Sequence, residues 1–261
     1  MKARAIQSDI PVIVVGNISV GGNGKTPVLI ALAHYLTKQG YKVGIVSRGY
    51  KAKATCFPVW CDQNSDPLLC GDEPVMIAKK TQLAVVVDPY RSRAVQALSK
   101  LPNLDFILSD DGLQHYNMGR TFEIAVIGSN AALGNRHLLP AGPLREPISR
   151  LKSVDWVVGD KSLPYVNYGI EIEPIGFYSV NSGQKVSLEW IKKHKICAVT
   201  GIALPERFHS QLKYMGLEFS ISNFPDHHHF KQRDFSPHLN ELILMTEKDA
   251  VKCSHMKLEN A

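Results

Sequence analysis

The apolar residues of this chain gather in short continuous runs, and stretches with a helical repeat separate them. Most runs are apolar without alternation, which is typical of strands that are covered on both faces of a sheet. The helical stretches at 26–38, 73–80, 90–100 and 204–215 supply the crossovers that parallel strands need. The pattern therefore predicts an α/β fold in which helices cover both faces of a mostly parallel sheet. The predicted strands are 12–16, 42–47, 83–88, 104–110, 123–128, 154–159, 196–201 and 242–247.

The segment 161–195 interrupts this alternation, because it carries Pro164 and Pro174 among several tyrosines and glycines. We interpret the segment as a linker or a two-stranded connection. It divides the chain into a larger core at 1–160 and a smaller C-terminal α/β lobe at 196–261.

Composition narrows the class of protein. The chain has 261 residues, of which 44% are hydrophobic, so it can bury a sizeable core and is not expected to be disordered. No apolar run approaches the ~18 residues of a membrane span, and the start MKARAIQSDIP has no apolar signal core, which predicts a cytoplasmic protein. The formal charge of +6 favours an anionic partner such as a phosphate, a lipid surface or a nucleic acid. Five scattered cysteines without a CxxC pair indicate reduced thiols rather than disulfides or a zinc site.

The stretch SVGGNGKTP follows the first predicted strand and begins a predicted helix. A Walker A loop has a glycine five residues before its Gly-Lys pair, and Ser19 stands there in this chain. The backbone N–H groups of residues 21–25 can still line a concavity for phosphates, with Lys25 as a cation and Thr26 placed to hold Mg²⁺. Val20 stands where partitioning-type ATPases of the deviant Walker class carry a signature Lys, which disfavours that class. The predicted cofactor-binding residues are Ser19, Val20, Gly21, Gly22, Asn23, Gly24, Lys25 and Thr26.

Two pairs of carboxylates are candidates for chemistry. Asp110 and Asp111 end the run FILSDD in the manner of a Walker B acid, which holds Mg²⁺ or its water shell. Asp72 and Glu73 stand at a predicted helix start, where capping and the helix dipole alone also account for acidic residues. We assign Glu73, together with Thr26, Asp110 and Asp111, to the predicted metal site.

Cations stand near the ends of several predicted strands, where ligands bind in open parallel sheets. Each of them taken singly is better explained as a surface ion-pair partner. They are Arg48, Arg91, Arg145 and Lys248.

Two histidine-containing stretches add to these candidates. Gln114 and His115 follow the acidic pair Asp110–Asp111 at a tight turn. The stretch FPDHHHF, at 224–230, allows three interpretations: a metal-binding cluster, one catalytic histidine with a carboxylate partner, or a solvated loop.

Eight motifs occur in the order VVGNISVGGNGKTP, VSRGY, GDEP, SDDGLQH, LPAGPLREP, LKSVD, FPDHH and MTEKDAVK. Taken together, they resemble those of the tetraacyldisaccharide 4'-kinase family, which phosphorylates a lipid A precursor in Gram-negative bacteria. The likeness runs from about Pro11 to Cys253, and the phosphate loop of the family is similar to this one in having Ser or Thr before the glycine pair. The resemblance implies a P-loop NTPase-like kinase core at 1–160, with the smaller lobe at 196–261 closing over the nucleotide site.

The activity that this resemblance implies uses ATP and Mg²⁺. The γ-phosphate passes to the 4'-hydroxyl of an acylated glucosamine disaccharide that already carries a phosphate at its other end. The implied partner is that lipid, met by peripheral contact with the cytosolic face of the inner membrane, and neither a nucleic acid nor a protein partner is implied.

The resemblance also assigns roles to residues. Asp72 matches the proposed base of the GDEP motif, and His227 matches the histidine of FPDH that acts with it. Arg145 matches the arginine of GPLRE and faces phosphate. The implied catalytic residues are Asp72, His227, Lys25 and Arg145, and we assign substrate binding to Arg48, Arg91, Gln114 and His115.

Two departures from the family pattern are visible. Family members usually carry a longer, partly apolar helical leader and continue past TEKDAVKC, whereas ten residues precede Pro11 here and the chain stops at Ala261. We therefore expect a member shortened at both ends, with weakened membrane attachment. Two other hypotheses stay open: a truncated remnant that binds ATP without catalysis, and a metal-delivery P-loop GTPase. The run His227–His229 points to the GTPase, although no N-K-x-D stretch for guanine follows a strand.

Overall fold

The computed structural model describes residues 6–128, 133–253, 256 and 258. Its chain forms two compact units, Met1–Ile172 and Glu173–Ala261. The boundary between them falls inside the segment 161–195 that the sequence marks as a connection. Each unit is built around a parallel sheet of its own.

The described part of the first unit forms an eight-stranded sheet in the order β3-β4-β2-β5-β1-β6-β7-β8. Neighbouring strands are parallel except for the edge pair β3 and β4, which is antiparallel. Its strands are β1 (Val12–Gly16), β2 (Val43–Ser47), β3 (Val59–Cys61), β4 (Val85–Val87), β5 (Phe106–Asp110), β6 (Phe122–Ile127), β7 (Trp156–Gly159) and β8 (Tyr168–Gly169). Its helices are α1 (Lys25–Lys38), α2 (Pro67–Cys70), α3 (Asp72–Thr81), α4 (Arg91–Leu98) and the 3₁₀-helix η2 (Ile148–Lys152).

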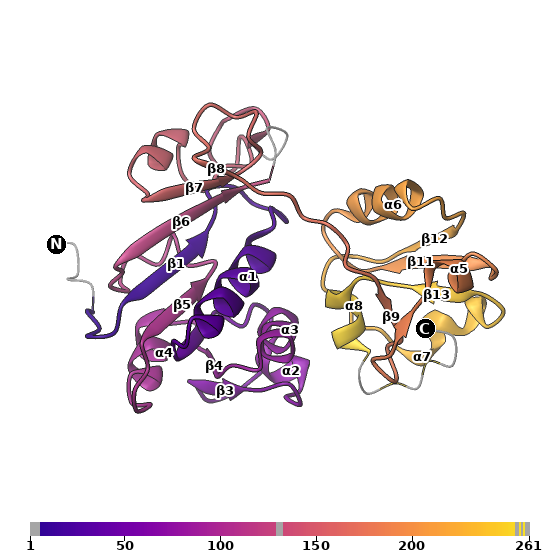
Figure 1. The fold of residues 1–261 in the computed structure, drawn as a ribbon, viewed down its shortest axis with the longest axis horizontal. Helices are drawn as coiled ribbons and strands as arrows, with labels where there is room; N and C mark the ends of the chain where they lie inside the picture. The colour runs from indigo at the N-terminus through magenta and orange to yellow at the C-terminus, as the bar shows by residue number, and fades with distance from the viewer. Residues whose placement is uncertain (1–5, 129–132, 254–255, 257, 259–261) are drawn as a thin grey trace. The chain divides into compact units, whose positions relative to one another are not determined.

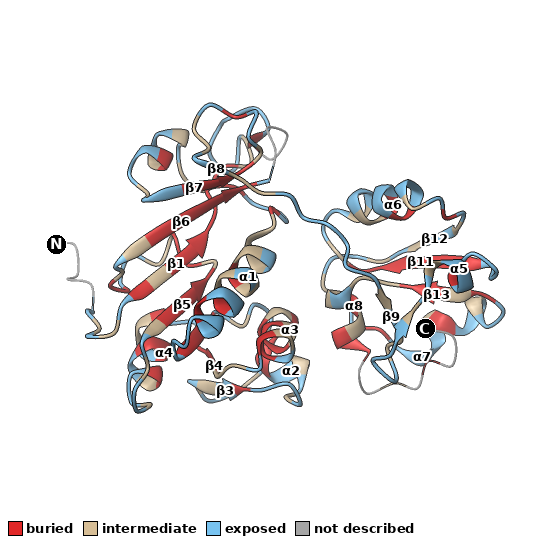
Figure 2. Ribbon diagram, in the orientation of Figure 1, coloured by how far each residue is buried: buried red, intermediate tan, exposed pale blue. Residues whose placement is uncertain are grey.

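Helices cover both faces of this sheet. Figure 1 shows α1 and α3 on one face and α4 on the other. This arrangement follows from right-handed crossovers, because β1–α1–β2 and β2–α3–β4 advance along the sheet in one direction and β4–α4–β5 returns in the other. The central strands β1, β2, β4 and β5 are buried on both faces, which explains their continuous apolar runs (Figure 2). The predicted α/β class is confirmed.

The second unit contains a three-stranded parallel sheet in the order β12-β11-β13, and a separate antiparallel pair, β9 and β10. Its strands are β9 (Phe177–Tyr178), β10 (Lys185–Val186), β11 (Ile196–Thr200), β12 (Ser220–Asn223) and β13 (Leu242–Leu244). Its helices are α5 (Leu188–Ile191), α6 (Pro205–Tyr214), α7 (Gln232–Phe235), the 3₁₀-helix η3 (Ser236–His238) and α8 (Glu247–Lys252). Strand β11 is buried along its whole length and is the centre of this unit.

In the described part of the chain, no helix has both the length and the apolar character that crossing a membrane requires.

Candidate active site

The loop between β1 and α1 has a conformation that its sequence requires. Gly21 and Gly24 have φ angles of 98° and 85°, in the region that residues with a Cβ avoid. Inside the loop, Asn23 Nδ2 donates to Ser19 Oγ at 2.9 Å, and both side chains are buried. Residues 25–28 include no acidic side chain, so the N–H groups and dipole of α1 face the loop without a competing carboxylate from the first turn of the helix itself. This is the geometry of an anion-binding helix start.

Lys25 lies between this loop and an acidic residue at the end of β5. Its Nζ is 3.5 Å from the carbonyl oxygen of Gly21 and 3.7 Å from Asp111 Oδ1. Arg145 Nη1 donates to both oxygens of Asp111, at 3.1 and 2.9 Å. Burial raises the pKa of Asp111, but Lys25 and Arg145 outweigh it, so the pKa is lowered and the carboxylate stays ionised. Three residues that are distant in sequence therefore meet at the mouth of the loop.

Asp110 lies beside this cluster in a different electrostatic environment. It is 3% exposed, and its side chain accepts a hydrogen bond from Ser47 Oγ at 3.2 Å. Burial, followed by the charges of Glu73 and Asp111, raises its pKa from 3.8 to about 7, against the opposing effect of Arg91. Carboxylates crowded in this way hold excess negative charge, which a divalent cation relieves.

Asp110 should make the stability of the metal-free protein depend on pH. Its folded-state pKa lies above its ordinary value of 3.8, so its stabilising contribution is complete below about pH 4 and is lost as the pH rises through about 7. We expect the thermal midpoint of wild type in EDTA to fall over this range relative to that of Asp110→Asn. Thermal unfolding of both proteins at pH 5 and pH 8 checks this, and parallel pH profiles would contradict it.

Asp72 and Glu73 form the first turn of α3, after Gly71 with a φ of 93°. Asp72 is 7% exposed, and a Cβ on Gly71 would lie 3.1 Å from the carbonyl oxygen of Tyr50 and 3.3 Å from the Cα of Gly49. The start of α3 is thus packed against the segment that leaves β2. Because Glu73 also acts on the pKa of Asp110, this helix start belongs to the same carboxyl edge of the sheet as the phosphate loop.

Two of the other predicted cations, Arg48 and Arg91, act on His115. Arg91 is 2% exposed, and its Nη2 donates to the carbonyl oxygen of Asp110 at 2.6 Å. Burial, together with the charges of Arg91 and Arg48, lowers the pKa of His115 from 6.5 to about 4, so this ring is neutral at pH 7. Two arginines beside a neutral imidazole make a positive region that suits a phosphate.

Gln114 connects the site to residues that the sequence analysis missed. Its Nε2 donates to the carbonyl oxygen of Asn17 at 2.9 Å and to Glu146 Oε1 at 2.6 Å, while its Oε1 accepts from Arg145 at 3.3 Å. Glu146 also accepts a hydrogen bond from the hydroxyl of Tyr116. Glu146 therefore fixes the amide that orients Arg145.

Glu123, on β6, binds two arginines that hold residues 113–116. It accepts from Arg120 at 2.8 Å and from Arg150 at 2.6 and 2.7 Å, and its side chain is 11% exposed. Arg120 in turn donates to the carbonyl oxygens of Leu113 and His115. One carboxylate thus holds two arginines against residues 113–116. The only sequence signal was an isolated glutamate in an otherwise apolar strand.

Removing this carboxylate should destabilise the first unit. Glu123→Gln removes the carboxylate that pairs with Arg120 and one of the two that pair with Arg150, whose Nε also lies 3.2 Å from Glu146 Oε2. We expect the free energy of unfolding to fall by roughly 3 kcal/mol. Urea unfolding measures the change. The matched control is Glu171→Gln, at an exposed position of the same unit, which should change stability by less than about 0.5 kcal/mol. Equal effects of the two variants would show that Glu123 anchors nothing.

His227, in the second unit, lies in the turn that follows β12. Its φ is 60°, and its N–H donates to the carbonyl oxygen of Gly201 at 3.1 Å, just beyond the end of β11. Its Nε2 lies 3.5 Å from Lys248 Nζ and 3.7 Å from Asp226 Oδ2, with the side chain 11% exposed. This ring is therefore held between a cation and a carboxylate at the carboxyl end of the sheet.

The two following histidines differ from His227. His228 Nε2 lies 2.9 Å from Asp234 Oδ2, and its ring stacks on Phe224 with centroids 4.5 Å apart. His229 is exposed. Among the described residues, the side chains of His227, His228 and His229 do not come together as a group of three potential metal ligands.

The structure thus joins Lys25, Asp111, Arg145 and Gln114 by direct contacts. Arg91 contacts the backbone of Asp110, Glu73 acts on the pKa of Asp110, and Arg48 acts on the pKa of His115. Val20 is 41% exposed, and its N–H donates to the carbonyl oxygen of Pro143 at 2.9 Å; Gly22 is exposed, and Thr26 lies in the first turn of α1. Asp72 belongs to the first unit and His227 to the second, so their joint action stays a prediction.

Comparisons with known proteins show which proteins this chain is similar to. The family model described as LpxK, tetraacyldisaccharide-1-P 4'-kinase, matches residues 2–261. A tetraacyldisaccharide 4'-kinase of Legionella pneumophila (strain Corby) is 47% identical over 247 residues, which cover 94% of this chain and 75% of that protein. One from Haemophilus influenzae (strain 86-028NP) is 43% identical over 254 residues, covering 96% and 76%. A crystal structure of LpxK from Aquifex aeolicus in complex with ATP matches with a TM-score of 0.77 and 29% identity, over 97% of this chain and 82% of that one.

Proposed function

The chain belongs to the tetraacyldisaccharide-1-P 4'-kinase family, and we propose that it transfers the γ-phosphate of ATP to the 4'-hydroxyl of a tetraacylated glucosamine disaccharide 1-phosphate in lipid A synthesis. The observation that carries the proposal is the meeting of Lys25, Asp111 and Arg145 at the phosphate loop. Two cations around one carboxylate, beside a helix start, form a site for a charged phosphoryl group and its metal.

ATP occupies the loop from Ser19 to Thr26 in this proposal. The backbone N–H groups of the glycine-rich segment surround the β- and γ-phosphates, and Lys25 exchanges its 3.7 Å contact with Asp111 for the phosphates. The Aquifex aeolicus LpxK, which matches this chain over 97% of its length, was crystallised with ATP, and this supports the assignment.

Mg²⁺ fits the donor set beside this loop. Glu73, Asp110 and Asp111 offer carboxylate oxygens, Thr26 offers a hydroxyl, and the raised pKa of Asp110 reflects the excess of negative charge there. When bound, Mg²⁺ neutralises charge on the phosphate oxygens and orients the γ-phosphate. The same carboxylates would repel the triphosphate in its absence, so nucleotide and metal are expected to bind together.

For the transfer step, the protein must position the reactants and stabilise the charge on the transferring group. The 4'-oxygen bonds to the γ-phosphorus, the bond between that phosphorus and the β–γ bridging oxygen breaks, and ADP leaves. Lys25 and Arg145 stabilise the charge that spreads over the transferring group. The hydroxyl proton passes to Asp72, a buried carboxylate at the start of α3, and His227 assists this base.

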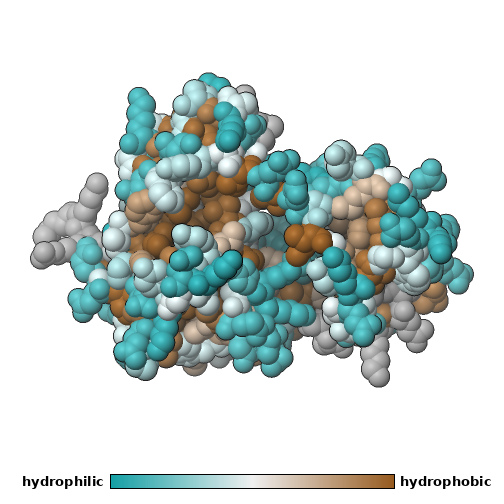
Figure 3. Space-filling view, in the orientation of Figure 1, coloured by the Kyte–Doolittle hydropathy of each residue, from teal (hydrophilic) through white to brown (hydrophobic). Residues whose placement is uncertain are grey.

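The acceptor lipid has two chemically different parts, and both have counterparts in the first unit. Arg48, Arg91, Gln114 and His115 make the polar region that meets its sugar and phosphate. Apolar surface gathers over β1 and β6, beside α1 (Figure 3). Leu138 and Leu139, which are 46% and 52% exposed, lie in the same loop as Arg145, and we propose that they contact acyl chains.

We place the enzyme at the cytosolic face of the inner membrane, by peripheral contact. The formal charge of +6 favours an anionic lipid surface, and exposed apolar side chains add affinity for it. Flotation of the protein with vesicles of anionic lipid, compared with neutral lipid, tests this placement.

One assay tests the proposed reaction. The protein is incubated with γ-labelled ATP, Mg²⁺ and the monophosphorylated tetraacyl disaccharide in detergent micelles, and the lipids are separated by chromatography. Label in a bisphosphorylated lipid, and none when the acceptor lacks its 4'-hydroxyl, is the expected result. Hydrolysis of ATP without labelled lipid would overturn the proposed acceptor.

A further inference from the structure

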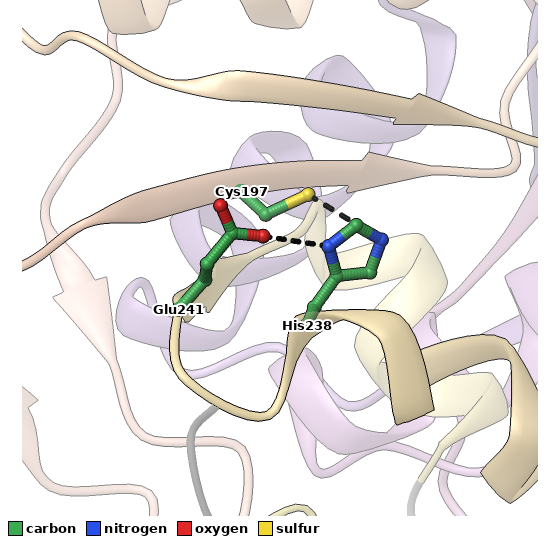
Figure 4. A group of neighbouring side chains, drawn as sticks. All are labelled: Cys197, His238 and Glu241. Atoms are coloured by element: carbon green, nitrogen blue, oxygen red, sulfur yellow. Dashed lines mark hydrogen bonds and ion pairs between the residues drawn. The ribbon is translucent and has the colours of Figure 1, made fainter.

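A second group of chemically reactive side chains lies in the second unit, away from the carboxyl ends of its strands. Cys197 is the second residue of β11, His238 ends η3, and Glu241 immediately precedes β13 (Figure 4). One potential ligand atom from each lies within 4.8 Å of the other two. Within the described residues, this is the only such group of three.

The three side chains face one another in a definite order. Cys197 Sγ lies 3.9 Å from His238 Nε2, and His238 Nδ1 lies 2.7 Å from Glu241 Oε2. Cys197 is 0% exposed and Glu241 is 9% exposed, while the His238 side chain, at 17%, leaves a route from solvent. The surrounding fold therefore holds the three side chains in place.

Surrounding side chains hold the carboxylate of Glu241. Its Oε1 accepts from Ser220 Oγ at 3.3 Å and pairs with Lys195 Nζ at 3.1 Å. Partners of this kind orient a ligand carboxylate from outside the metal's own shell. The Lys195 side chain is 76% exposed, so it can turn into solvent at little cost when a cation takes its place.

A thiolate, an imidazole and a carboxylate together form a donor set for zinc. Zn²⁺ takes sulfur, nitrogen and oxygen ligands in a tetrahedral shell, and sites with three protein ligands keep water in the fourth position. A hard cation such as Mg²⁺ prefers oxygen ligands alone. The chemistry of this group therefore selects a zinc-class ion and excludes the metal of the phosphoryl-transfer site.

We propose that Cys197, His238 and Glu241 bind one zinc-class divalent ion in the second unit. Binding exchanges the thiol proton of Cys197 for the metal and ties η3 and the start of β13 to the central strand β11. The site is separate from the proposed base, because His227 is anchored at Gly201, which is four positions beyond Cys197, about 13 Å along an extended strand.

Cobalt provides the test, because Co²⁺ occupies zinc sites and a bound thiolate gives it a charge-transfer absorption band. The full chain, freed of metal by chelation, is titrated with Co²⁺ under reducing conditions. We expect one equivalent to bind with a thiolate band, and one equivalent of Zn²⁺ to displace it. The thermal midpoint of unfolding should rise as the concentration of Zn²⁺ is raised.

Variants locate the ion. Cys197→Ser should remove the thiolate band, and Glu241→Gln should weaken Co²⁺ binding at least tenfold, with far-ultraviolet circular dichroism confirming that both are folded. Cys253→Ser is the matched control, because Cys253 is also 0% exposed in the same unit and should leave titration unchanged. Wild type without stoichiometric Co²⁺ binding, or a thiolate band that survives in Cys197→Ser, overturns the proposal. Binding that is lost instead in His229→Ala would place the ion on the His227–His229 tract and overturn it equally.

Discussion

Lys25→Ala should abolish phosphoryl transfer, with kcat reduced by at least about 10³-fold. Lys25 Nζ lies 3.5 Å from the carbonyl oxygen of Gly21 in the loop, and 3.7 Å from Asp111 Oδ1. Its loss removes charge that the transferring phosphoryl group needs, and it leaves Asp111 with Arg145 as its remaining contact cation. Initial rates with saturating ATP and acceptor measure the effect.

The control for this variant comes from the same helix. Lys38 lies in the last turn of α1 and is exposed, so Lys38→Ala changes charge and helix propensity without touching the loop. Its kcat should stay within about threefold of wild type. Wild-type turnover in Lys25→Ala would contradict the assignment of this loop as phosphate-binding. If Lys38→Ala lost as much activity as Lys25→Ala, the cause would be a folding defect. Circular dichroism of both variants separates these causes.

The main strands of the fold could be predicted because they are buried on both faces. Each of the eight predicted strands corresponds to a strand of the structure, and β1 and β5 are continuous apolar runs. The strands β3, β8 and β12 escaped prediction because they are short and lie at sheet edges. β3 has one buried residue, and β8 and β12 have none, so burial imposes no apolar pattern on them. The periodicity of apolar residues reflects burial, so it does not reveal a strand or helix that has few buried residues.

The candidate site divides in the same way. Lys25 and Asp111 could be found because each belongs to a short motif of phosphate-binding proteins, in which the position of the functional residue relative to its neighbours is fixed. Glu123 and Glu146 could not, because their role depends on which arginines and amides reach them from other elements. Cys197 and His238 are 41 residues apart and match no short ligand spacing, so only the fold brings them together.

The second large effect concerns the base. His227→Ala should lower kcat by roughly 10²-fold with little change in the KM for ATP, as expected when a group acts chiefly in the transition state. His227 suits such a role, because its ring is held by Lys248 and Asp226 and its backbone by Gly201. The matched control is His229→Ala, an exposed neighbour, which should change kcat by less than about threefold.

The combination of His227→Ala with Asp72→Ala tests whether the two residues act as one unit. Asp72 is 7% exposed at the start of α3, and a general base takes a proton efficiently only when it is held within reach of that proton. If His227 provides that assistance, the double variant should lose much less activity than the product of the single losses, because either change already disables the pair. Rates for wild type, both single variants and the double variant give the coupling. Losses that multiply would mean that His227 acts independently of Asp72, and the proton would then pass to Asp72 alone.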